Sequence, residues 1–267
     1  MQTTEVYKAV TKDIKKINLL RGGARSSKTF SLLQMSVKWL MTGKIGSQIV
    51  PKGIVLICRE TFPALRRTVL REFENMMHQT GQMPYVDWSK STHEFRFEGR
   101  QIMFVPLDDP TKVLGLQTAW FWINEGNPID YNIFTQLLLR CENFCFLDYN
   151  PFDIDGWINK ELEKKRLPKR GDVNLTVSTY KMNPFLPQEI IDEIEYLEHT
   201  DNELFQVYNK GQWAKVQGLV FPNWEYLEED KKPTKYCYGL DFGYNDPTAL
   251  VRVGIKDREL YIEEARS

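Results

Sequence analysis

A run of eight small and polar residues near the amino terminus has the composition of a phosphate-binding loop. It reads Gly22-Gly23-Ala24-Arg25-Ser26-Ser27-Lys28-Thr29, follows a short apolar run and opens a helical pattern. In such a loop the backbone N–H groups face the phosphates, Lys28 would reach the outer phosphates and Thr29 would hold Mg²⁺. Ser27 stands where the usual pattern has its second glycine. The sequence therefore predicts a site for ATP and Mg²⁺ at residues 22–29.

Arg25 is an unusual residue for such a loop. An arginine there would place a positive charge in cis near the γ-phosphate, where it would stabilise the charge that develops during phosphoryl transfer. A surface arginine with no catalytic role is an equally good interpretation. Arg25 is therefore a candidate catalytic residue with an open alternative.

Two further segments place polar residues at the ends of apolar runs. Glu125 follows the run 120–123 and is the expected base that activates the attacking water. Asn124 precedes it, where many such enzymes have a Mg²⁺-binding aspartate, and its amide would orient a Mg²⁺-bound water without adding charge. By itself an Asn-Glu pair is more often a loop cap, but the loop at 22–29 supports the catalytic interpretation of this pair. Asn150, before Pro151, would sense the γ-phosphate, although a turn-forming Asn-Pro pair explains it equally well.

These candidates need a scaffold that brings several strand ends together. Apolar runs that predict buried strands alternate with patterns that predict helices. The strands are expected at 17–20, 53–58, 120–123 and 144–147, the helices at 28–42, 63–79 and 129–140, and a hairpin at 95–105. The alternation predicts an α/β fold with a mainly parallel sheet flanked by helices, whose ligand lies beyond the carboxyl ends of the strands.

The composition excludes several classes of protein. The 267 residues include 35 Lys and Arg and 36 Asp and Glu, so a polyanion would have to be bound by local patches and not by net charge. The four cysteines and three histidines lack metal-ligand spacing, so we expect no zinc cluster and reduced thiols inside a cell. With no signal sequence and no stretch of 18 apolar residues, we expect neither secretion nor a membrane span.

Basic and acidic residues are segregated into separate runs along the chain. Residues 160–170 carry six Lys or Arg and two Glu, whereas residues 189–203 carry seven acids and no Lys or Arg. Solvated helix faces are the commoner explanation of such runs. If the protein binds DNA, the basic run is the preferred place for phosphate contacts.

The order of these motifs resembles that of the large terminase subunit of tailed bacteriophages, the ATP-driven motor that packages DNA into procapsids. The resemblance extends over nearly the whole chain. It rests on the 22–29 loop and, in family order, on segments 59–61, 65–68, 124–125, 150–151, 179–186, 211–213, 218–221 and 239–249. The family tolerates small residues at the position of Ser27, and its members often have an acid at the position of Asn124.

The resemblance implies three parts. Residues 1–170 would form an ASCE-type P-loop ATPase core, 171–232 a small helical subdomain and linker, and 233–267 the start of an RNase H-like nuclease domain. Asn150 falls in the motif that couples the ATP state to movement. Asp241 matches the first acid of the nuclease, which cuts DNA with two Mg²⁺ or Mn²⁺ ions. Few residues follow Asp241, so we expect endonuclease activity only in a longer form of the protein.

The resemblance also implies partners and a location. The partners are double-stranded DNA, the portal protein, the small terminase subunit and further copies of the chain in a ring on the portal. The location is the host cell cytoplasm, and no membrane is involved. Two other functions fit the loop and Glu125. One is another P-loop translocase or helicase, and the other is a nucleotide-binding capsid-associated protein that does not hydrolyse ATP.

Overall fold

The computed structural model describes residues 3–109, 111, 115–213, 233–241, 249–256 and 259–266. The chain divides into two compact units, residues 1–217 and 218–267. The predicted linker at Lys231-Lys232 and the 218–221 segment lie outside the described residues. The domain boundaries predicted after residues 170 and 232 stay predictions.

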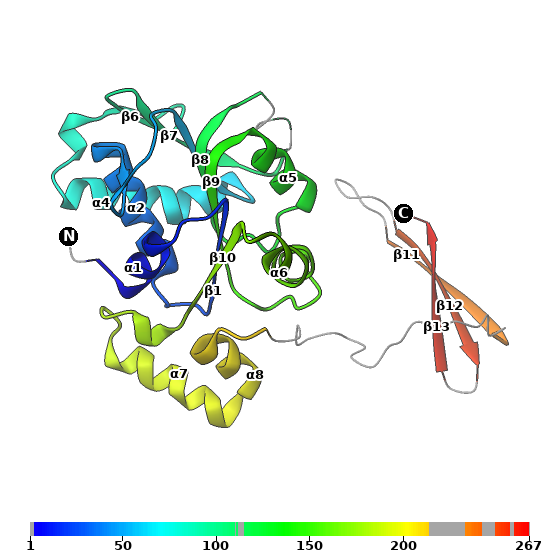
Figure 1. Cartoon of the computed structure of the whole chain (residues 1–267). Helices are drawn as coiled ribbons and strands as arrows, with labels where there is room; N and C mark the ends of the chain where they lie inside the picture. The colour runs from blue at the N-terminus through cyan, green and yellow to red at the C-terminus, as the bar shows by residue number, and fades with distance from the viewer. Residues whose placement is uncertain are drawn as a thin grey trace. The chain divides into compact units, whose positions relative to one another are not determined.

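The first unit is built on an eight-stranded sheet with strand order β10-β1-β9-β8-β4-β7-β6-β5 (Figure 1). Neighbouring strands from β10 to β7 pair in parallel, and β7, β6 and β5 form an antiparallel meander. The strands are β1 (Ile17–Gly22), β4 (Ile54–Arg59), β5 (Asp87–Ser89), β6 (Glu94–Phe97), β7 (Arg100–Pro106), β8 (Thr118–Ile123), β9 (Cys141–Tyr149) and β10 (Val173–Ser178). A short hairpin, β2 (Lys44–Ile45) and β3 (Gln48–Ile49), stands apart from this sheet.

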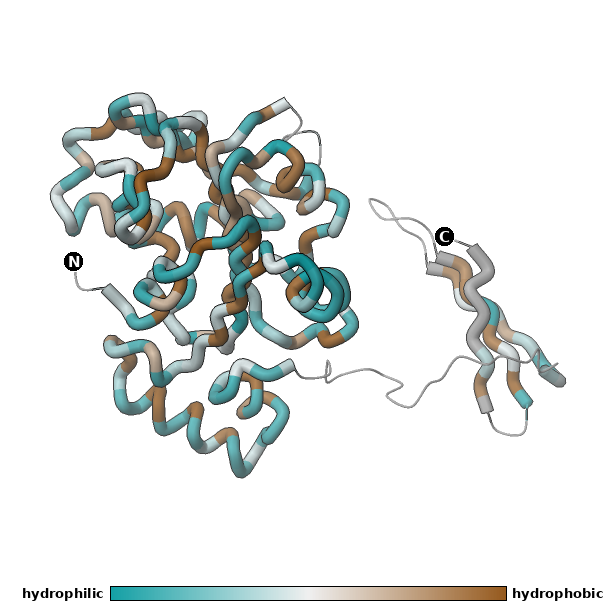
Figure 2. Tube along the Cα trace, viewed as in Figure 1, coloured by the Kyte–Doolittle hydropathy of each residue, from teal (hydrophilic) through white to brown (hydrophobic). Residues whose placement is uncertain are grey.

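Helices cover both faces of the sheet. One apolar core joins the sheet to α1 (Glu5–Lys12), α2 (Lys28–Thr42), α3 (Phe62–Leu65), η1 (Arg66–Leu70) and α4 (Arg71–Gln79), and a second joins it to α5 (Tyr131–Arg140) and η4 (Ile158–Arg166). Alternate strand residues face opposite sides. Trp120 and Trp122 of β8 therefore lie in the first core and Phe121 and Ile123 in the second. Figure 2 shows the strands as the apolar centre of this unit.

The mainly parallel α/β fold predicted from the sequence is confirmed. β1, β8 and β9 contain three of the four apolar runs, β4 begins at Ile54 within the fourth, and β6 pairs antiparallel with β7. Both strands of this hairpin belong to the main sheet, because β7 pairs with β4. β10 was not among the expected strands. As an edge strand it is only partly buried, so its sequence lacks the continuous apolar character of the central strands.

A group of short helices follows β10 in the chain. They are η5 (Tyr180–Met182), α7 (Gln188–Thr200), α8 (Asn202–Phe205) and η6 (Gln206–Lys210). The acidic run 189–203 lies on α7 and α8, which is the solvated helix that the sequence pattern favours. The basic run lies on η4 and α6 (Leu167–Arg170).

The second unit contains a three-stranded antiparallel sheet with strand order β11-β12-β13. Its strands are β11 (Lys235–Asp241), β12 (Ala249–Lys256) and β13 (Glu259–Arg266). Strand-like runs at 236–242, 248–255 and 259–263, joined by short turns, predict three strands in this part of the sequence, and the three strands are confirmed within the described residues. Within the described residues of both units, no helix combines the length and the apolar character needed to cross a bilayer.

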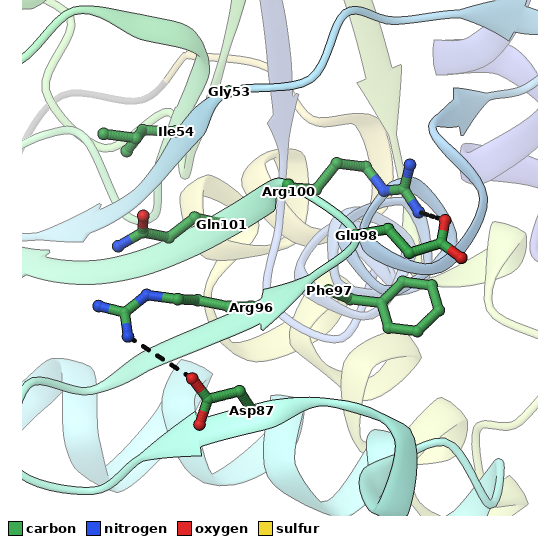
Figure 3. A pocket seen from close by; sticks show the side chains of 9 residues that line it. Gly53, Ile54, Asp87, Arg96, Phe97, Glu98, Arg100 and Gln101 are labelled. Atoms are coloured by element: carbon green, nitrogen blue, oxygen red, sulfur yellow. Dashed lines mark hydrogen bonds and ion pairs between the residues drawn. The ribbon is translucent and has the colours of Figure 1, made fainter.

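A pocket of about 390 Å³ lies at the amino end of β4, beside the β5–β7 meander (Figure 3). In it Arg96 forms an ion pair with Asp87, and Arg100 forms one with Glu98. Ligands of open α/β sheets bind at the carboxyl ends of the strands. This pocket is therefore not the predicted nucleotide site, which lies at the other end of the strands.

Candidate active site

The strand order decides which polar residues meet. β9 lies between β1 and β8 in the sheet, although it follows both in the chain. The pairs Arg21–Tyr149 and Ile123–Leu147 place the carboxyl ends of the three strands side by side. The residues directly beyond these ends are the 22–29 loop, Asn150 and the Asn124-Glu125 pair. The structure thus brings the predicted ATP-site residues to one edge of the sheet.

The 22–29 loop adopts a backbone conformation that usually favours glycine. Arg25 has a φ of 65° and Ser27 a φ of 64°, both in the left-handed region. Ser27 is the N-cap residue of α2, so a serine makes the turn for which the usual pattern has a glycine. Its side chain forms no cap hydrogen bond. No side chain of the N-cap therefore occupies the first N–H groups of α2, which suit an anion such as phosphate.

Gly22 and Gly23 are required by close packing. A Cβ atom on Gly22 would overlap the carbonyl oxygen of Ser178 at the end of β10, and one on Gly23 would lie 2.5 Å from the Cα of Tyr208 in η6. Because neither position has room for a side chain, the loop backbone lies directly against β10 and η6. A change in the loop backbone would have to move the helical segment that follows β10.

Lys28 points into the loop. Its Nζ donates to the carbonyl oxygens of the two loop glycines, at 2.7 and 2.8 Å, and to Oδ1 of Asn150 at 3.1 Å. The side chain is 6% exposed. Burial lowers the pKa of Lys28 to about 8, and the negative charges of Asp148 and Glu125 oppose this shift. A buried cation therefore occupies the point where β1, β9 and the loop meet.

A buried carboxylate that the sequence analysis did not single out lies beside Asn124. Asp148, on β9, is 2% exposed. Asn124 donates from Nδ2 to Oδ1 and Oδ2 of Asp148, at 3.2 and 3.1 Å, and the same Nδ2 lies 3.4 Å from Oγ1 of Thr29. Trp122 donates from Nε1 to Oδ1 of Asp148 at 2.6 Å. The Asp148 carboxylate therefore joins β9 to β8, and the amide of Asn124 extends the contact to Thr29.

Two opposing effects act on the Asp148 carboxyl. Burial raises its pKa, while the charge of Lys28 and the hydrogen bonds from Trp122 and Asn124 oppose the rise. The spacing of Asp148 and Asn150 in the sequence is the feature from which Asp148 could have been placed in the site. Residues two apart in a strand point to the same side, so a second polar side chain could have been placed in the site.

Glu125 lies in the turn after β8 and forms an ion pair with Arg59, the last residue of β4. Arg59 was named only as part of a motif and not as a site residue. The turn is tight, with a φ of 54° at Glu125, and Gly126 N donates to the carbonyl oxygen of Asp148 at 2.9 Å. The Glu125 side chain is 54% exposed, whereas that of Arg59 is 14% exposed. The carboxylate is therefore open to solvent while its backbone is attached to β9.

Further contacts connect the loop to the motif at 179–186. Nδ2 of Asn183 donates to the carbonyl oxygen of Arg25 at 2.8 Å, and the ring of Phe185 packs edge-to-face on Phe30 of α2 at a centroid distance of 5.8 Å. Ser26 is buried, and its Oγ lies 3.1 Å from Oγ of Ser178. The side chains at positions 24 and 25 are exposed, which leaves the Arg25 guanidinium accessible from solvent.

The oxygen atoms near Thr29 are suitable ligands for a hydrated Mg²⁺ ion bound together with a nucleotide. The Oδ1 atom of Asn124 is buried and has no hydrogen-bond partner among the described residues. Such an orphaned acceptor beside a loop hydroxyl suits a cation or its water ligand. In the described part of the chain, no cluster of three or more His, Cys, Asp or Glu could hold a metal. The ion would therefore rely on phosphate oxygens as well as on the protein.

The predicted nuclease acid belongs to the second unit. Asp241 is the last residue of β11, and its backbone is paired with that of Ala249. Its side chain lies outside the described part of the structure. The assignment of Asp241 as a nuclease metal ligand stays a prediction.

The site geometry can be compared with known proteins. A family model described as phage terminase large subunit matches residues 14–212. This range contains the 22–29 loop, Glu125 and Asn150. The chain belongs to the phage terminase large subunit family. The family recognised from the order of the motifs is thereby confirmed.

Two curated members of the terminase family align with most of the chain. The PBSX phage terminase large subunit of Bacillus subtilis (strain 168) is 26% identical over 279 residues, covering 91% of this chain and 62% of the relative. The terminase large subunit of Bacillus phage SPP1 is 26% identical over 261 residues, covering 88% of this chain and 59% of the relative. The chain thus spans about three fifths of the length of these relatives.

Solved terminases share the fold. The large terminase of a thermophilic bacteriophage, in complex with ADP, superposes with a TM-score of 0.66 at 18% identity, covering 98% of this chain and 69% of that chain. Together with the mainly parallel sheet and the loop between β1 and α2, this likeness confirms the predicted α/β P-loop fold.

Proposed function

We propose that this chain is the motor part of a terminase large subunit, which hydrolyses ATP and uses it to move double-stranded DNA into a procapsid. The observation that carries the proposal is the convergence of Lys28, Asn150 and the Asn124-Glu125 pair at the N-terminus of α2. Membership of the terminase family supports the packaging role, and the terminase of the thermophilic bacteriophage, which was solved with ADP, supports the nucleotide.

Each residue of the site has a role in this proposal. Lys28 binds the outer phosphates, and Thr29 and Asn124 hold the Mg²⁺ that accompanies ATP. Glu125 accepts the proton of the attacking water, and its exposed carboxylate is accessible for that role. When bound, Mg²⁺ neutralises phosphate charge. Arg25 stabilises the charge that develops on the γ-phosphate.

Asn150 is the proposed coupling residue. Its Oδ1 accepts from Lys28, and its backbone carbonyl accepts from Nδ2 of Asn127 at 3.0 Å. Phosphates that draw Lys28 away from Asn150 would change both contacts at the end of β9. The packing of Gly23 on Tyr208 offers a path by which the loop would move the following helices.

The alternative functions differ in what they require. A helicase or remodeller would share Lys28 and Glu125, but the family match favours a packaging motor. A non-hydrolysing nucleotide-binding protein was suggested by the uncharged Asn124. The buried Asp148 next to it weakens that alternative, because a carboxylate does lie in hydrogen-bond contact with Asn124.

Phosphate release from MgATP, measured for the purified chain with and without linear duplex DNA, tests the proposed function. We expect hydrolysis by the isolated chain to be slow, because ring motors commonly complete each site with a neighbouring copy. We expect duplex DNA to accelerate it, because DNA is the proposed cargo. Binding of ATP without phosphate release under either condition would favour the non-hydrolysing alternative. Hydrolysis that responds only to single-stranded DNA would favour a helicase.

The proposal extends to partners and location. The motor would work as a ring on the portal protein with the small terminase subunit, in the host cytoplasm and transiently at the procapsid. We further propose that Asp241, together with other acids, binds Mg²⁺ or Mn²⁺ for the endonuclease activity of the terminase.

DNA contact is expected on the basic run of η4 and α6, which is hydrophilic in Figure 2. Within the run, Arg166 forms two hydrogen bonds to Asp172, and Lys160 and Lys165 form ion pairs with Asp155 and Glu161. These partners leave other members of the run, Lys164, Lys169 and Arg170, as exposed side chains without an ion pair among the described residues. They are the residues best suited to contact phosphates.

Replacing Lys164, Lys169 and Arg170 together with alanine should reduce the salt dependence of DNA binding. Each lost phosphate contact lowers the slope of log K against log salt concentration by about 0.9. The matched control replaces the exposed Lys8, Lys12 and Lys90, which changes the net charge equally. Equal slopes for both triple variants would show that the basic run is only a solvated surface.

A further inference from the structure

The Mg²⁺ site expected in this fold has an unusual distribution of charge. The strand end after β8, where family members often have an acid before the glutamate, carries the neutral Asn124. The carboxylate at the corresponding position along the strands belongs instead to Asp148, on the neighbouring strand β9. Ile123 of β8 pairs with Leu147 of β9, so Asn124 and Asp148 lie one residue beyond a paired position. Adjacent strands are about 4.8 Å apart, which lets a side chain from either strand reach the same point.

Asp148 is held in a fixed orientation. Its Oδ1 accepts from Trp122 Nε1 at 2.6 Å and from Asn124 Nδ2 at 3.2 Å, whereas among the described residues its Oδ2 accepts from Asn124 alone, at 3.1 Å. Oδ2 therefore keeps acceptor capacity. The orientation of the Asn124 amide follows from these contacts, because turning it over would place its oxygen against the carboxylate. The same amide nitrogen is 3.4 Å from Thr29 Oγ1, so one amide contacts both the Asp148 carboxylate and the loop hydroxyl.

The charge of Asp148 lacks a direct partner. The side chain is 2% exposed, and among the described residues it takes part in no ion pair within 4.0 Å. Lys28, whose charge acts on Asp148, directs its Nζ to the loop carbonyls and to Asn150. A buried carboxylate without a paired cation is unfavourable for folding. Such a group is expected where a cation binds during function.

We propose that Asp148 provides the carboxylate for the Mg²⁺ that accompanies ATP, from β9 instead of β8, and that Asn124 positions this carboxylate next to Thr29. The inference rests on the proposed function, since it concerns the metal of the ATP site. Mg²⁺ prefers one or two carboxylates together with phosphate oxygens and water. Asp148, Thr29 and the orphaned Oδ1 of Asn124 supply donors of that kind.

The test measures metal binding separately from turnover. Mn²⁺, a spectroscopic substitute for Mg²⁺, is titrated into the chain with ADP bound, and free Mn²⁺ is followed by electron paramagnetic resonance. Asp148→Asn should weaken Mn²⁺ binding by roughly 10- to 100-fold. The affinity for ADP measured in EDTA should not change, because no metal is present. Asp155→Asn, which removes an exposed carboxylate, serves as the control and should leave Mn²⁺ binding unchanged.

A swap of the two side chains makes the test more specific. The double variant Asn124→Asp/Asp148→Asn returns the carboxylate to β8 and should recover Mn²⁺ affinity. Asn124→Asp alone places two carboxylates side by side, so it should bind Mn²⁺ more tightly and melt at a lower temperature without metal. These two variants decide the question even if Asp148→Asn alone does not fold.

Several results would overturn the inference. Wild-type Mn²⁺ affinity in Asp148→Asn would reduce Asp148 to a structural partner of Trp122. A swapped variant that folds but does not recover Mn²⁺ affinity would likewise show that Asp148 is not a ligand of the metal. Failure of the unmodified chain to bind ADP with or without metal would instead contradict the proposed function on which the inference rests.

Discussion

Glu125→Gln should bind ATP as the unmodified chain does and lose nearly all hydrolysis. Glutamine has the size of glutamate and can still accept a hydrogen bond from Arg59, but it cannot take a proton from water. General base catalysis commonly contributes about 100- to 10,000-fold to a rate, so kcat should fall by roughly that factor. The measurement combines single-turnover phosphate release with the binding of a fluorescent ATP analogue.

The control for this variant is Glu193→Gln, which changes an exposed glutamate of α7 in the same way. It should hydrolyse ATP at the unmodified rate. If Glu125→Gln also hydrolyses ATP at that rate, Glu125 is not the base. In that case the ion pair between Glu125 and Arg59 would be a structural contact at the end of β4.

Lys28→Ala should lose nucleotide affinity as well as turnover. Lys28 is the cation at the centre of the loop, and hydrogen bonds to charged groups contribute about 1.5–3 kcal/mol each. ATP affinity should therefore fall by roughly 10- to 100-fold. Isothermal titration calorimetry with ATP and Mg²⁺ measures the change. The contrast with Glu125→Gln is the expected result, since Lys28 is the proposed phosphate ligand and Glu125 is the proposed base that acts on water.

Loss of Lys28 also removes the donor to the carbonyl oxygens of Gly22 and Gly23. The melting temperature of the nucleotide-free variant therefore has to be measured beside its affinity. Lys38→Ala, an exposed lysine on the same helix, is the matched control and should bind ATP normally. A folded Lys28→Ala that binds ATP with unchanged affinity would contradict the assignment of the 22–29 loop.

Much of the fold was predictable from local sequence. The period of apolar residues depends on neighbours two to four positions apart, and it identified the central strands and the helix at 28–42. Gly43 follows the last apolar residue of that pattern, where a C-cap glycine is expected, and it ends the helix with a φ of 70°. The loop at 22–29 was predictable for the same reason, since its glycines, lysine and threonine are consecutive.

Other features of the site depend on residues that are distant in the chain. Arg59 and Glu125 are 66 residues apart, Thr29 and Asn124 95 apart, and Lys28 and Asn150 122 apart. No local pattern reports such pairs. They follow from the order of strands in the sheet, which depends on how the helices pack on its two faces.

The α/β alternation, the 22–29 loop and the candidates at the strand ends were predictable from the sequence alone, because each of these is a property of consecutive or nearby residues, and the family was predictable from the order of such segments along the chain. Only the tertiary structure decided that β9 lies between β1 and β8 and that β10 completes the sheet. That order places the buried Asp148 opposite Asn124 and brings η6 against Gly23. The physical reason is that burial and hydrogen bonding act between surfaces brought together by the whole chain, so a carboxylate on one strand can lie where the neighbouring strand has an amide.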